Sequence, residues 1–222
     1  MNHRSFTRAL LLGLALLVGT PVWPAPEPTN LSTAKREVLA YVESGAYGRE
    51  IVKVAMEASR HVIRRAARGA KEGTKLAVVF DIDETALTNL AHMQAMDFGY
   101  VPNLWDEWVA AGQAKAIIPV QTVYDTAVRL GLEVIFITGR KPSDALGTER
   151  NLREVGYETW AQIHYKPADH RGTARDFKVG VRKRLTQEGY VIIANLGDQQ
   201  SDLLGGYAEK IFKLPNPFYH IR

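Results

Sequence analysis

The sequence predicts a doubly wound α/β fold, in which helices cover both faces of a parallel β-sheet. Runs rich in valine and isoleucine alternate with segments of helical periodicity, a pattern typical of parallel strands that are buried on both faces. Three of these runs are followed directly by polar and acidic residues, at the strand ends where such sheets bind ligands. The chain of 222 residues, 46% hydrophobic and 23% charged, suits one packed domain.

The expected strands and helices follow from the spacing of the apolar residues. Strands are predicted over residues 76–80, 133–138, 161–165, 191–195 and 210–214. Helices are predicted between them, near residues 120–130, 144–155 and 175–187. Residues 32–72 also have helical spacing, with Ser32 as the expected N-cap and Gly45 dividing two helices. We therefore expect an N-terminal helical extension ahead of the sheet.

The first twenty residues have the pattern of an export signal. Arg4 and Arg8 precede an apolar run over residues 9–18, which is short for a membrane span. An uncleaved anchor is the alternative interpretation, but we favour cleavage, which would give a periplasmic or secreted protein without a stable membrane anchor. The expected organisation is a signal peptide over residues 1–20 with cleavage within 20–25, a proline-rich linker over 21–30 and a single domain over 31–222.

Cysteine content and charge exclude several classes of protein. The chain has no cysteine, so disulfides, thiolate zinc sites and the lipid-bearing cysteine of a lipoprotein are not expected. The formal charge is +4, and because Arg4 and Arg8 contribute two of these charges, the chain without its signal would carry about +2. This weak charge does not indicate binding to a nucleic acid polymer. The sequence makes no prediction about the oligomeric state.

Acidic residues follow two of the predicted strands. Asp81 and Asp83 come directly after residues 76–80, and Asp198 and Asp202 follow residues 191–195. Like charges at such short spacing repel one another unless a cation lies between them. Carboxylates without thiolates or a dense set of histidines favour a hard, octahedral cation such as Mg²⁺. The sequence therefore predicts a magnesium site at this edge of the sheet, which calls for an anionic substrate.

The remaining groups predict a site for phosphoryl transfer. Thr138 and the backbone amides around Gly139 can donate hydrogen bonds to phosphoryl oxygens. A fixed cation is also required for the charge that develops during transfer, and we favour Lys178 over Lys166 for this role. Positioning and electrostatic stabilisation would do most of the catalytic work at such a site.

Four motifs in this order resemble those of the haloacid-dehalogenase superfamily. They are "DIDET" at 81–85, "ITGR" at 137–140, the lysine of "FKVGVRKRL" at 177–185 and "GDQQSD" at 197–202. Together with "KLPNPFY" at 213–219, they resemble the acid-phosphatase branch that includes plant vegetative storage proteins and bacterial lipoprotein acid phosphatases and nucleotidases. The likeness runs from about residue 31 to residue 222, and it implies a HAD-like, Rossmannoid domain.

The resemblance implies a mechanism and a role for each motif residue. Asp81 would attack phosphorus and form an aspartyl-phosphate, and Asp83 would protonate the leaving alcohol and then activate water. Mg²⁺ would be held by Asp81, the backbone carbonyl of Asp83 and Asp198, with support from Asp202. The implied function is an exported, Mg²⁺-dependent acid phosphatase that acts on small phosphomonoesters.

Substrate preference is the part that the resemblance leaves most open. Gln200 stands where many relatives have tryptophan, and His92 stands near a position that is often aromatic. The segment 85–119 is short for a cap domain, so we expect a minimal cap and an open site of broad specificity, including 5′-nucleotidase activity. Phe98, Tyr100 and Trp105 are candidates to stack on a nucleobase, and Trp105 and Trp108, three residues apart, either pack internally or line the pocket.

Two expectations concern the remaining alternatives. The histidines at 61, 92, 164, 170 and 220 have no ligand spacing, and we expect them to be structural or exposed at the surface.

A catalytically weak storage or binding protein of the same fold is the main alternative to an enzyme. Loss of activity in such a protein should appear as replacement of the nucleophile, and Asp81 is present here.

Overall fold

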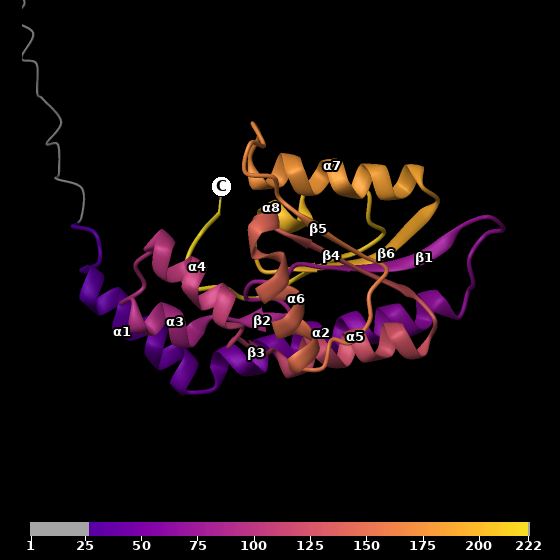
Figure 1. Ribbon diagram of the computed structural model, residues 1–222. Helices are drawn as coiled ribbons and strands as arrows, with labels where there is room; N and C mark the ends of the chain where they lie inside the picture. The colour runs from indigo at the N-terminus through magenta and orange to yellow at the C-terminus, as the bar shows by residue number, and fades with distance from the viewer. Residues whose placement is uncertain (1–26, 222) are drawn as a thin grey trace, which may run out of the picture.

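Five parallel strands form the central sheet of the computed structural model, which describes residues 27–221 (Figure 1). Their order across the sheet is β5 (Gln162–Tyr165), β4 (Glu133–Thr138), β1 (Lys75–Phe80), β6 (Tyr190–Gly197) and β7 (Ile211–Lys213). Each neighbouring pair runs parallel. The carboxyl ends of β1, β4 and β6 therefore meet at one edge, as the sequence predicted.

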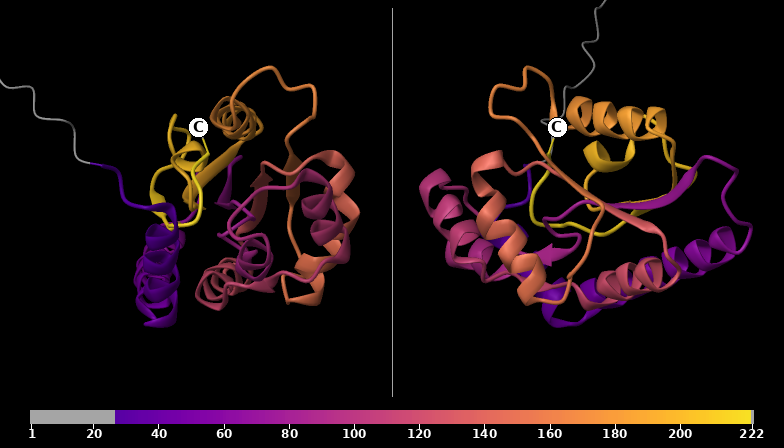
Figure 2. Two further views of the ribbon diagram at one scale, coloured as in Figure 1. Left: turned by 90° about the vertical axis from the view of Figure 1, so that its left-hand side faces the viewer. Right: turned by 45° about the vertical axis from the view of Figure 1, so that its right-hand side comes forward.

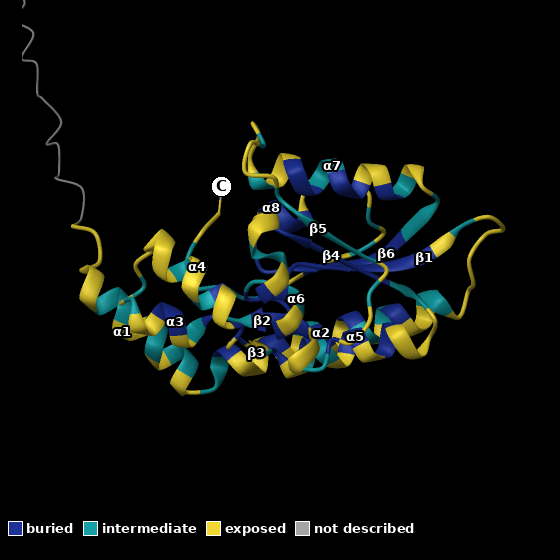
Figure 3. Cartoon of the chain, in the orientation of Figure 1, coloured by how far each residue is buried: buried dark blue, intermediate teal, exposed yellow. Residues whose placement is uncertain are grey.

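Helices cover both faces of this sheet. α2 (Ala46–Ala66) and α5 (Ile118–Arg129) lie side by side on one face, and α7 (Ala174–Gln187) covers the other (Figures 1 and 2). The larger apolar core is buried beneath α2 and α5, and the smaller one is buried beneath α7 (Figure 3). This arrangement is the predicted doubly wound α/β fold.

The N-terminal extension consists of α1 (Leu31–Glu43) and the first part of α2, as expected. Gly45 has φ 74°, a left-handed conformation that suits glycine, and it separates the two helices. The predicted N-cap at Ser32 is wrong: Asn30 precedes α1, and its side chain accepts a hydrogen bond from the Ser32 amide at 3.0 Å. Both residue types cap helices well, so local pattern alone did not decide between them.

The segment between β1 and α5 folds into a small inserted unit. It contains β2 (Leu87–Thr88), α3 (Leu90–Ala95), α4 (Pro102–Ala111) and β3 (Lys115–Ala116). β2 pairs with β3 in an antiparallel ribbon. α4 packs closely on α6 (Ala145–Glu154), where a side chain at Gly147 would come within 2.4 Å of the Val109 carbonyl oxygen. Glycine is thus required for this approach, which fixes the inserted unit beside the sheet edge.

Two further short helices follow strands at the same edge. They are the 3-10 helix Pro142–Asp144 after β4 and α8 (Gln200–Leu203) after β6. After β7, the last residues of the chain turn back toward the end of β6, where their hydrogen bonds lie. The predicted signal peptide lies outside the described residues, and residues 27–30 of the predicted linker form no helix or strand. Within residues 27–221 no helix combines the length and apolar character needed to cross a membrane.

Candidate active site

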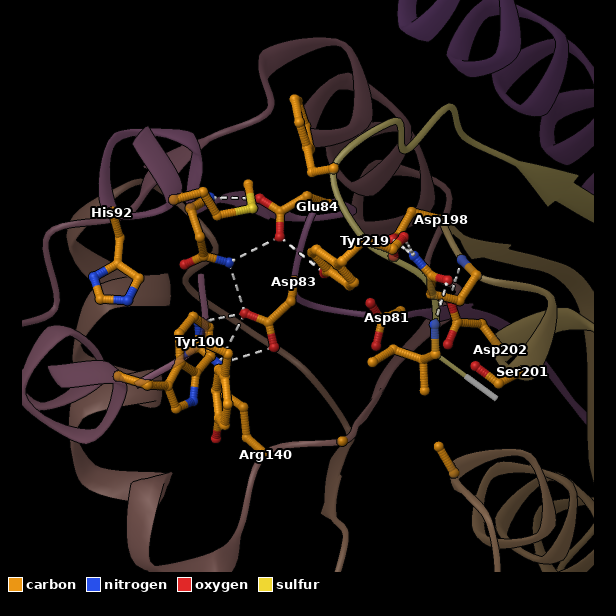
Figure 4. Close-up of a pocket in the computed structure, with 18 of the residues that line it drawn as sticks. Asp81, Asp83, Glu84, His92, Tyr100, Arg140, Asp198, Ser201, Asp202 and Tyr219 are labelled. Carbon is orange, nitrogen blue, oxygen red and sulfur yellow. Dashed lines mark hydrogen bonds and ion pairs between the residues drawn. The ribbon is translucent and has the colours of Figure 1, made fainter. Parts of the chain in front are cut away.

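A cavity of about 380 Å³ lies at the edge where β1, β4 and β6 end. Its lining comes from the sheet edge, the inserted unit, α7, α8 and the C-terminal segment, here defined as residues 214–221. Figure 4 shows the acidic side chains gathered along this cavity, with Asp81 between Asp83 and the pair Asp198 and Asp202. Sequence motifs separated by more than a hundred residues therefore meet at one place.

Three carboxylates form a cluster suited to a divalent cation. One oxygen from each of Asp81, Asp198 and Asp202 lies within 4.8 Å of the others, and all three residues are buried. Gly197 allows Asp202 to enter the cluster, because a side chain at this glycine would lie 2.4 Å from the Asp202 Cβ. A buried set of oxygen ligands of this kind suits a hard cation.

Lys178 supplies a positive charge within the same cluster. Its ammonium group donates hydrogen bonds to Asp81 and, at 2.6 Å, to Asp202. Lys178 projects inward from α7 because it shares the buried face of that helix with Val181 and Leu185. Burial lowers the pKa of Lys178, but the carboxylates of Asp81 and Asp202 raise it by more, so the net pKa lies above its usual value and the lysine stays charged.

Burial and the neighbouring negative charges raise the pKa values of two acids in this cluster. Burial raises the pKa of Asp81 well above its usual value, with Lys178 opposing the rise and Asp202 adding to it. Burial and the neighbouring Asp202 raise the pKa of Asp198 to about 6, although hydrogen bonds from Asn216 and Gln199 lower it. These shifts have the direction expected of carboxylates whose mutual repulsion a bound cation would relieve.

Asp83 lies apart from this cluster and pairs with an arginine that we did not predict. Arg140 donates to the Asp83 carboxylate through Nε and Nη2, the shorter bond being 2.7 Å, and Asn89 Nδ2 donates at 2.9 Å. Asp83 is more accessible than Asp81, with 19% of its side chain exposed. The Asp83 side chain is therefore held at the cavity wall, outside the cluster of three carboxylates.

The residues predicted to bind phosphate occupy the end of β4. Thr138 is fully buried, and its hydroxyl accepts a hydrogen bond from the Arg140 amide at 3.0 Å. Gly139 lines the cavity directly. Lys166 lines it as well, but among the described residues Lys178 is the lysine that contacts Asp81.

Sequence reasoning missed several polar residues that hold the acids in place. The Asp198 Oδ2 atom accepts from Gln199 Nε2 at 2.8 Å and from Asn216 Nδ2 at 2.6 Å. Glu84, which is 1% exposed, accepts from the Asn89 amide at 2.6 Å and from the Tyr219 hydroxyl at 3.0 Å. Asn216 and Tyr219 belong to "KLPNPFY", so that motif marked the family in the sequence without revealing this role.

Aromatic side chains also line the cavity. The three candidates for base stacking, Phe98, Tyr100 and Trp105, all line the cavity. His92, which was expected to be structural or exposed at the surface, lines the cavity too and stacks on Trp108 with ring centroids 5.4 Å apart. Trp108 instead packs against the core and donates to Asn89 at 2.8 Å.

The inserted unit is small, as expected of a minimal cap. Together with the C-terminal segment it lines the cavity that contains Asp81, which is 6% exposed. Phe98 stacks on Phe218 at 6.2 Å between centroids, which joins these two walls. The inserted unit and the C-terminal segment are far apart in the sequence, so the length of the segment 85–119 alone did not reveal that both line the cavity.

The fold and site together define a Rossmannoid protein with an acidic cluster and a lysine at the carboxyl edge of its sheet. Residues 23–222 match the family described as HAD superfamily, subfamily IIIB (Acid phosphatase), and the chain belongs to that family. The membership predicted from the motifs is therefore confirmed.

Relatives within the plant kingdom share much of the chain. It is 37% identical over 163 residues, 70% of its length, to the stem 28 kDa glycoprotein of Glycine max, of whose length it spans 64%. It is 33% identical over 189 residues to acid phosphatase 1 of Solanum lycopersicum, covering 83% of this chain and 73% of that one. It is 31% identical over 155 residues to vegetative storage protein 1 of Arabidopsis thaliana, covering 68% of this chain and 57% of that one.

A solved structure supports the fold. The class C acid phosphatase from Bacillus anthracis aligns with a TM-score of 0.71 at 24% sequence identity, covering 86% of this chain and 85% of that chain. The predicted HAD-like, Rossmannoid architecture is therefore confirmed at the level of the fold.

Proposed function

We propose that this protein is an exported, Mg²⁺-dependent phosphomonoesterase of broad specificity that acts through an aspartyl-phosphate. The observation that carries the proposal is the contact of Lys178 with Asp81 and Asp202 at the base of a cavity, beside Asp198. A carboxylate nucleophile, a fixed cation and a cation-binding cluster in one cavity meet the requirements of phosphoryl transfer. Membership of an acid phosphatase family supports the same reaction.

Asp81 is the proposed nucleophile. Lys178 contacts Oδ1 of this residue, and no described residue donates a hydrogen bond to Oδ2. In the first step an Asp81 oxygen bonds to phosphorus while the bond from phosphorus to the leaving oxygen breaks, and protonated Asp83 gives its proton to that oxygen. In the second step Asp83 takes a proton from water, whose oxygen bonds to phosphorus as the bond to Asp81 breaks, which releases phosphate.

The acidic cluster fits Mg²⁺ by the chemistry of its ligands. Asp81, Asp198 and Asp202 offer oxygen atoms alone, and burial, with their mutual repulsion adding to it, raises the pKa of Asp81 and of Asp198. The backbone carbonyl of Asp83 is the further ligand that we propose. When bound, Mg²⁺ would supply positive charge that offsets the repulsion between the phosphoryl group and these carboxylates.

Lys178, Thr138 and Gly139 are proposed to hold the phosphoryl oxygens. Lys178 brings a charge that its two carboxylate partners preserve, and the Gly139 backbone faces the cavity. The Thr138 hydroxyl already accepts a hydrogen bond from the Arg140 amide, which orients the oxygen and leaves its proton for donation. These groups would make the site selective for a phosphomonoester dianion rather than for a particular alcohol.

Nucleoside monophosphates are the substrates that we propose this cavity prefers. The aromatic wall of Phe98, Tyr100 and Trp105 offers flat apolar surface for a base, and Tyr100 is 68% exposed at the cavity mouth. Stacking on such side chains is worth about 1–3 kcal/mol per base and depends little on the identity of the base. This interaction supports 5′-nucleotidase activity without strict base specificity.

A storage or binding protein is the second candidate. It is favoured by one specific observation, the similarity to proteins named vegetative storage protein and stem glycoprotein. An inactive relative should have lost catalytic groups, whereas Asp81, Lys178 and the cluster acids are all present here.

The test is release of inorganic phosphate from a panel of phosphomonoesters by the purified chain, in Mg²⁺ and in EDTA. We expect Mg²⁺-dependent release that Asp81→Asn abolishes, while Asp125→Asn, an exposed aspartate on α5, serves as the matched control and retains activity. A higher kcat/KM for nucleoside monophosphates than for glycerol phosphate would support the nucleotidase assignment. A folded, Mg²⁺-loaded protein that releases no phosphate would instead be the storage or binding protein.

Export is a separate part of the proposal and rests on the sequence of residues 1–20. The charged start and apolar run support a cleavable signal. N-terminal sequencing of the protein recovered from the medium or periplasm should begin within residues 20–26. Recovery of the intact N-terminus from membranes would favour an uncleaved anchor.

A further inference from the structure

The hydrogen bonds on the Asp83 carboxylate are distributed unevenly between its two oxygens. Oδ1 accepts from Arg140 Nη2 at 2.7 Å, from Asn89 Nδ2 at 2.9 Å and from Arg140 Nε at 3.1 Å. Oδ2 accepts from Arg140 Nε alone, at 3.2 Å, among the described residues. Three donors occupy Oδ1, so Oδ2 is the oxygen of this carboxyl group with more capacity for a further hydrogen bond.

Other residues hold the two donor side chains, Arg140 and Asn89, in place. Arg140 is 4% exposed, donates through Nη1 to Thr148 at 3.0 Å and lies over the Trp105 ring at 5.6 Å. Asn89 is fully buried, and its Oδ1 accepts from Trp108 at 2.8 Å. Arg140, which Figure 4 shows beside Asp83, and Asn89 thus present rigid donors to Asp83 from two different parts of the chain, which limits rotation of the carboxyl group.

We infer that Arg140 is a positioning residue that, with Asn89, fixes the Asp83 carboxyl group so that Oδ2, rather than Oδ1, is the oxygen available for proton transfer. The inference deepens the proposed function and rests on it. In the first step the proton leaves Oδ2 for the leaving oxygen as the bond from that oxygen to phosphorus breaks. In the second step Oδ2 receives a proton from the attacking water as the bond from phosphorus to Asp81 breaks.

A direct role for Arg140 on the phosphoryl group is the competing interpretation. Nε and Nη2 of Arg140 donate to Asp83 and Nη1 donates to Thr148, so three of the five guanidinium N–H donors hold the side chain against these two residues. Lys178 meanwhile contacts the proposed nucleophile itself. The observed contacts therefore join Arg140 to the proposed proton donor and Lys178 to the proposed nucleophile, and the kinetics of Arg140 variants separate the two roles.

The two roles differ in how the rate depends on the leaving group. p-Nitrophenolate leaves without a proton, whereas the alkoxide of a nucleoside 5′-monophosphate requires one, and kcat/KM reports the steps up to that departure. A positioning role predicts that Arg140→Met lowers kcat/KM for the nucleotide about 10²-fold more than for p-nitrophenyl phosphate, since general acid catalysis contributes about 10²–10⁴-fold. Asp83→Asn should show the same selectivity, and Arg140→Lys, which keeps one charged donor, should recover part of the loss.

Arg182→Lys is the matched control, because Arg182 is a fully buried arginine that binds the backbone carbonyls of Asp202, Leu204 and Gly206. Any loss that it causes should be equal for the two substrates. The inhibition constant of inorganic phosphate, measured for the wild type and Arg140→Lys, should agree within about twofold, because a twofold change corresponds to only about 0.4 kcal/mol.

The possible results separate this inference from the proposed function. Equal losses on both substrates in Arg140→Lys and Arg140→Met, or a large rise in the phosphate inhibition constant, would place Arg140 on the phosphoryl group and overturn the positioning role alone. A wild-type protein that hydrolyses neither substrate would overturn the proposed function, and the inference with it. If Arg140→Met does not fold, as judged by circular dichroism, the comparison of Arg140→Lys with Arg182→Lys still decides the matter.

Discussion

Glu84 contributes strongly to the dependence of the folded protein's stability on pH, and Glu84→Gln should remove that contribution. This carboxyl group is 1% exposed, and among the described residues no lysine, arginine or histidine forms an ion pair with it. Burial, followed by the charge of Asp83, raises its pKa from 4.5 to about 8. The folded state therefore binds a proton that the unfolded state has already released at neutral pH.

The sign and size of the effect follow from these two pKa values. Because the folded pKa is the higher one, the stabilising contribution of the bound proton is fully present below pH 4.5 and is lost as the pH rises through about 8. One pKa unit corresponds to about 1.4 kcal/mol, so Glu84 should cost the wild type about 3 kcal/mol between pH 5 and pH 7.5. Glutamine at position 84 does not titrate. Its amide group replaces one hydrogen-bond acceptor with a donor beside Asn89, which should cost about 1 kcal/mol of folding stability.

The measurement is urea unfolding in EDTA at pH 5 and pH 7.5, which excludes cations from the neighbouring acidic cluster. The two proteins should agree within about 1 kcal/mol at pH 5, and Glu84→Gln should be the more stable by about 3 kcal/mol at pH 7.5. Glu158→Gln, an exposed glutamate, is the control and should follow the wild type at both values. Parallel pH dependences for the wild type and Glu84→Gln would refute the reasoning.

Three further changes test the cluster. Lys178→Met should lower kcat about 10²–10³-fold by removing the fixed charge, and in EDTA it should destabilise the fold by about 3–5 kcal/mol because Asp81 and Asp202 lose their counterion. Gly197→Ala would place its Cβ 2.4 Å from the Cβ of Asp202 and so displace that side chain. We expect kcat to fall about 10²-fold. An unchanged kcat would show that catalysis does not require Asp202 at its observed position. Asn216→Leu removes the 2.6 Å bond to Asp198, so the Mg²⁺ concentration for half-maximal activity should rise about 10–100-fold, which a Mg²⁺ titration measures.

The parts of the fold that depend on local pattern could be predicted from the sequence. The strand ending at Phe80 is an unbroken apolar run, and the acids after it mark its carboxyl end, so both the parallel sheet and the edge that carries the site followed. Element boundaries were less certain where two residues of similar capping ability stood close together, as with Asn30 and Ser32. Local chemistry ranks such residues almost equally, and tertiary packing then decides.

The supporting side chains could not be predicted, because their partners are brought together only by the completed fold. Arg140 follows the "TG" of its motif and could equally have bound phosphate or solvent; the pair with Asp83 depends on how β4 lies beside β1. His92 has no ligand spacing, and its place in the cavity depends on its packing against Trp105 and Trp108. Sequence reasoning therefore located the charged groups and missed what orients them.

The C-terminal segment carries a motif that could be recognised in the sequence and contacts that only the structure shows. Asn216 binds Asp198, Tyr219 binds Glu84, and the Ile221 amide binds Gln199. Each of these partners lies in the "DIDET" or "GDQQSD" motif, so the segment crosses the site and contacts both acidic motifs. The sheet ends at β7, before this segment begins, so the fold does not require these residues to form its strands. Asn216 and Tyr219 instead donate to two buried acids, Asp198 and Glu84, whose mutual repulsion opposes folding, and these two hydrogen bonds offset part of that cost. The proposed activity thus depends on residues that follow the last strand as well as on the motif acids themselves.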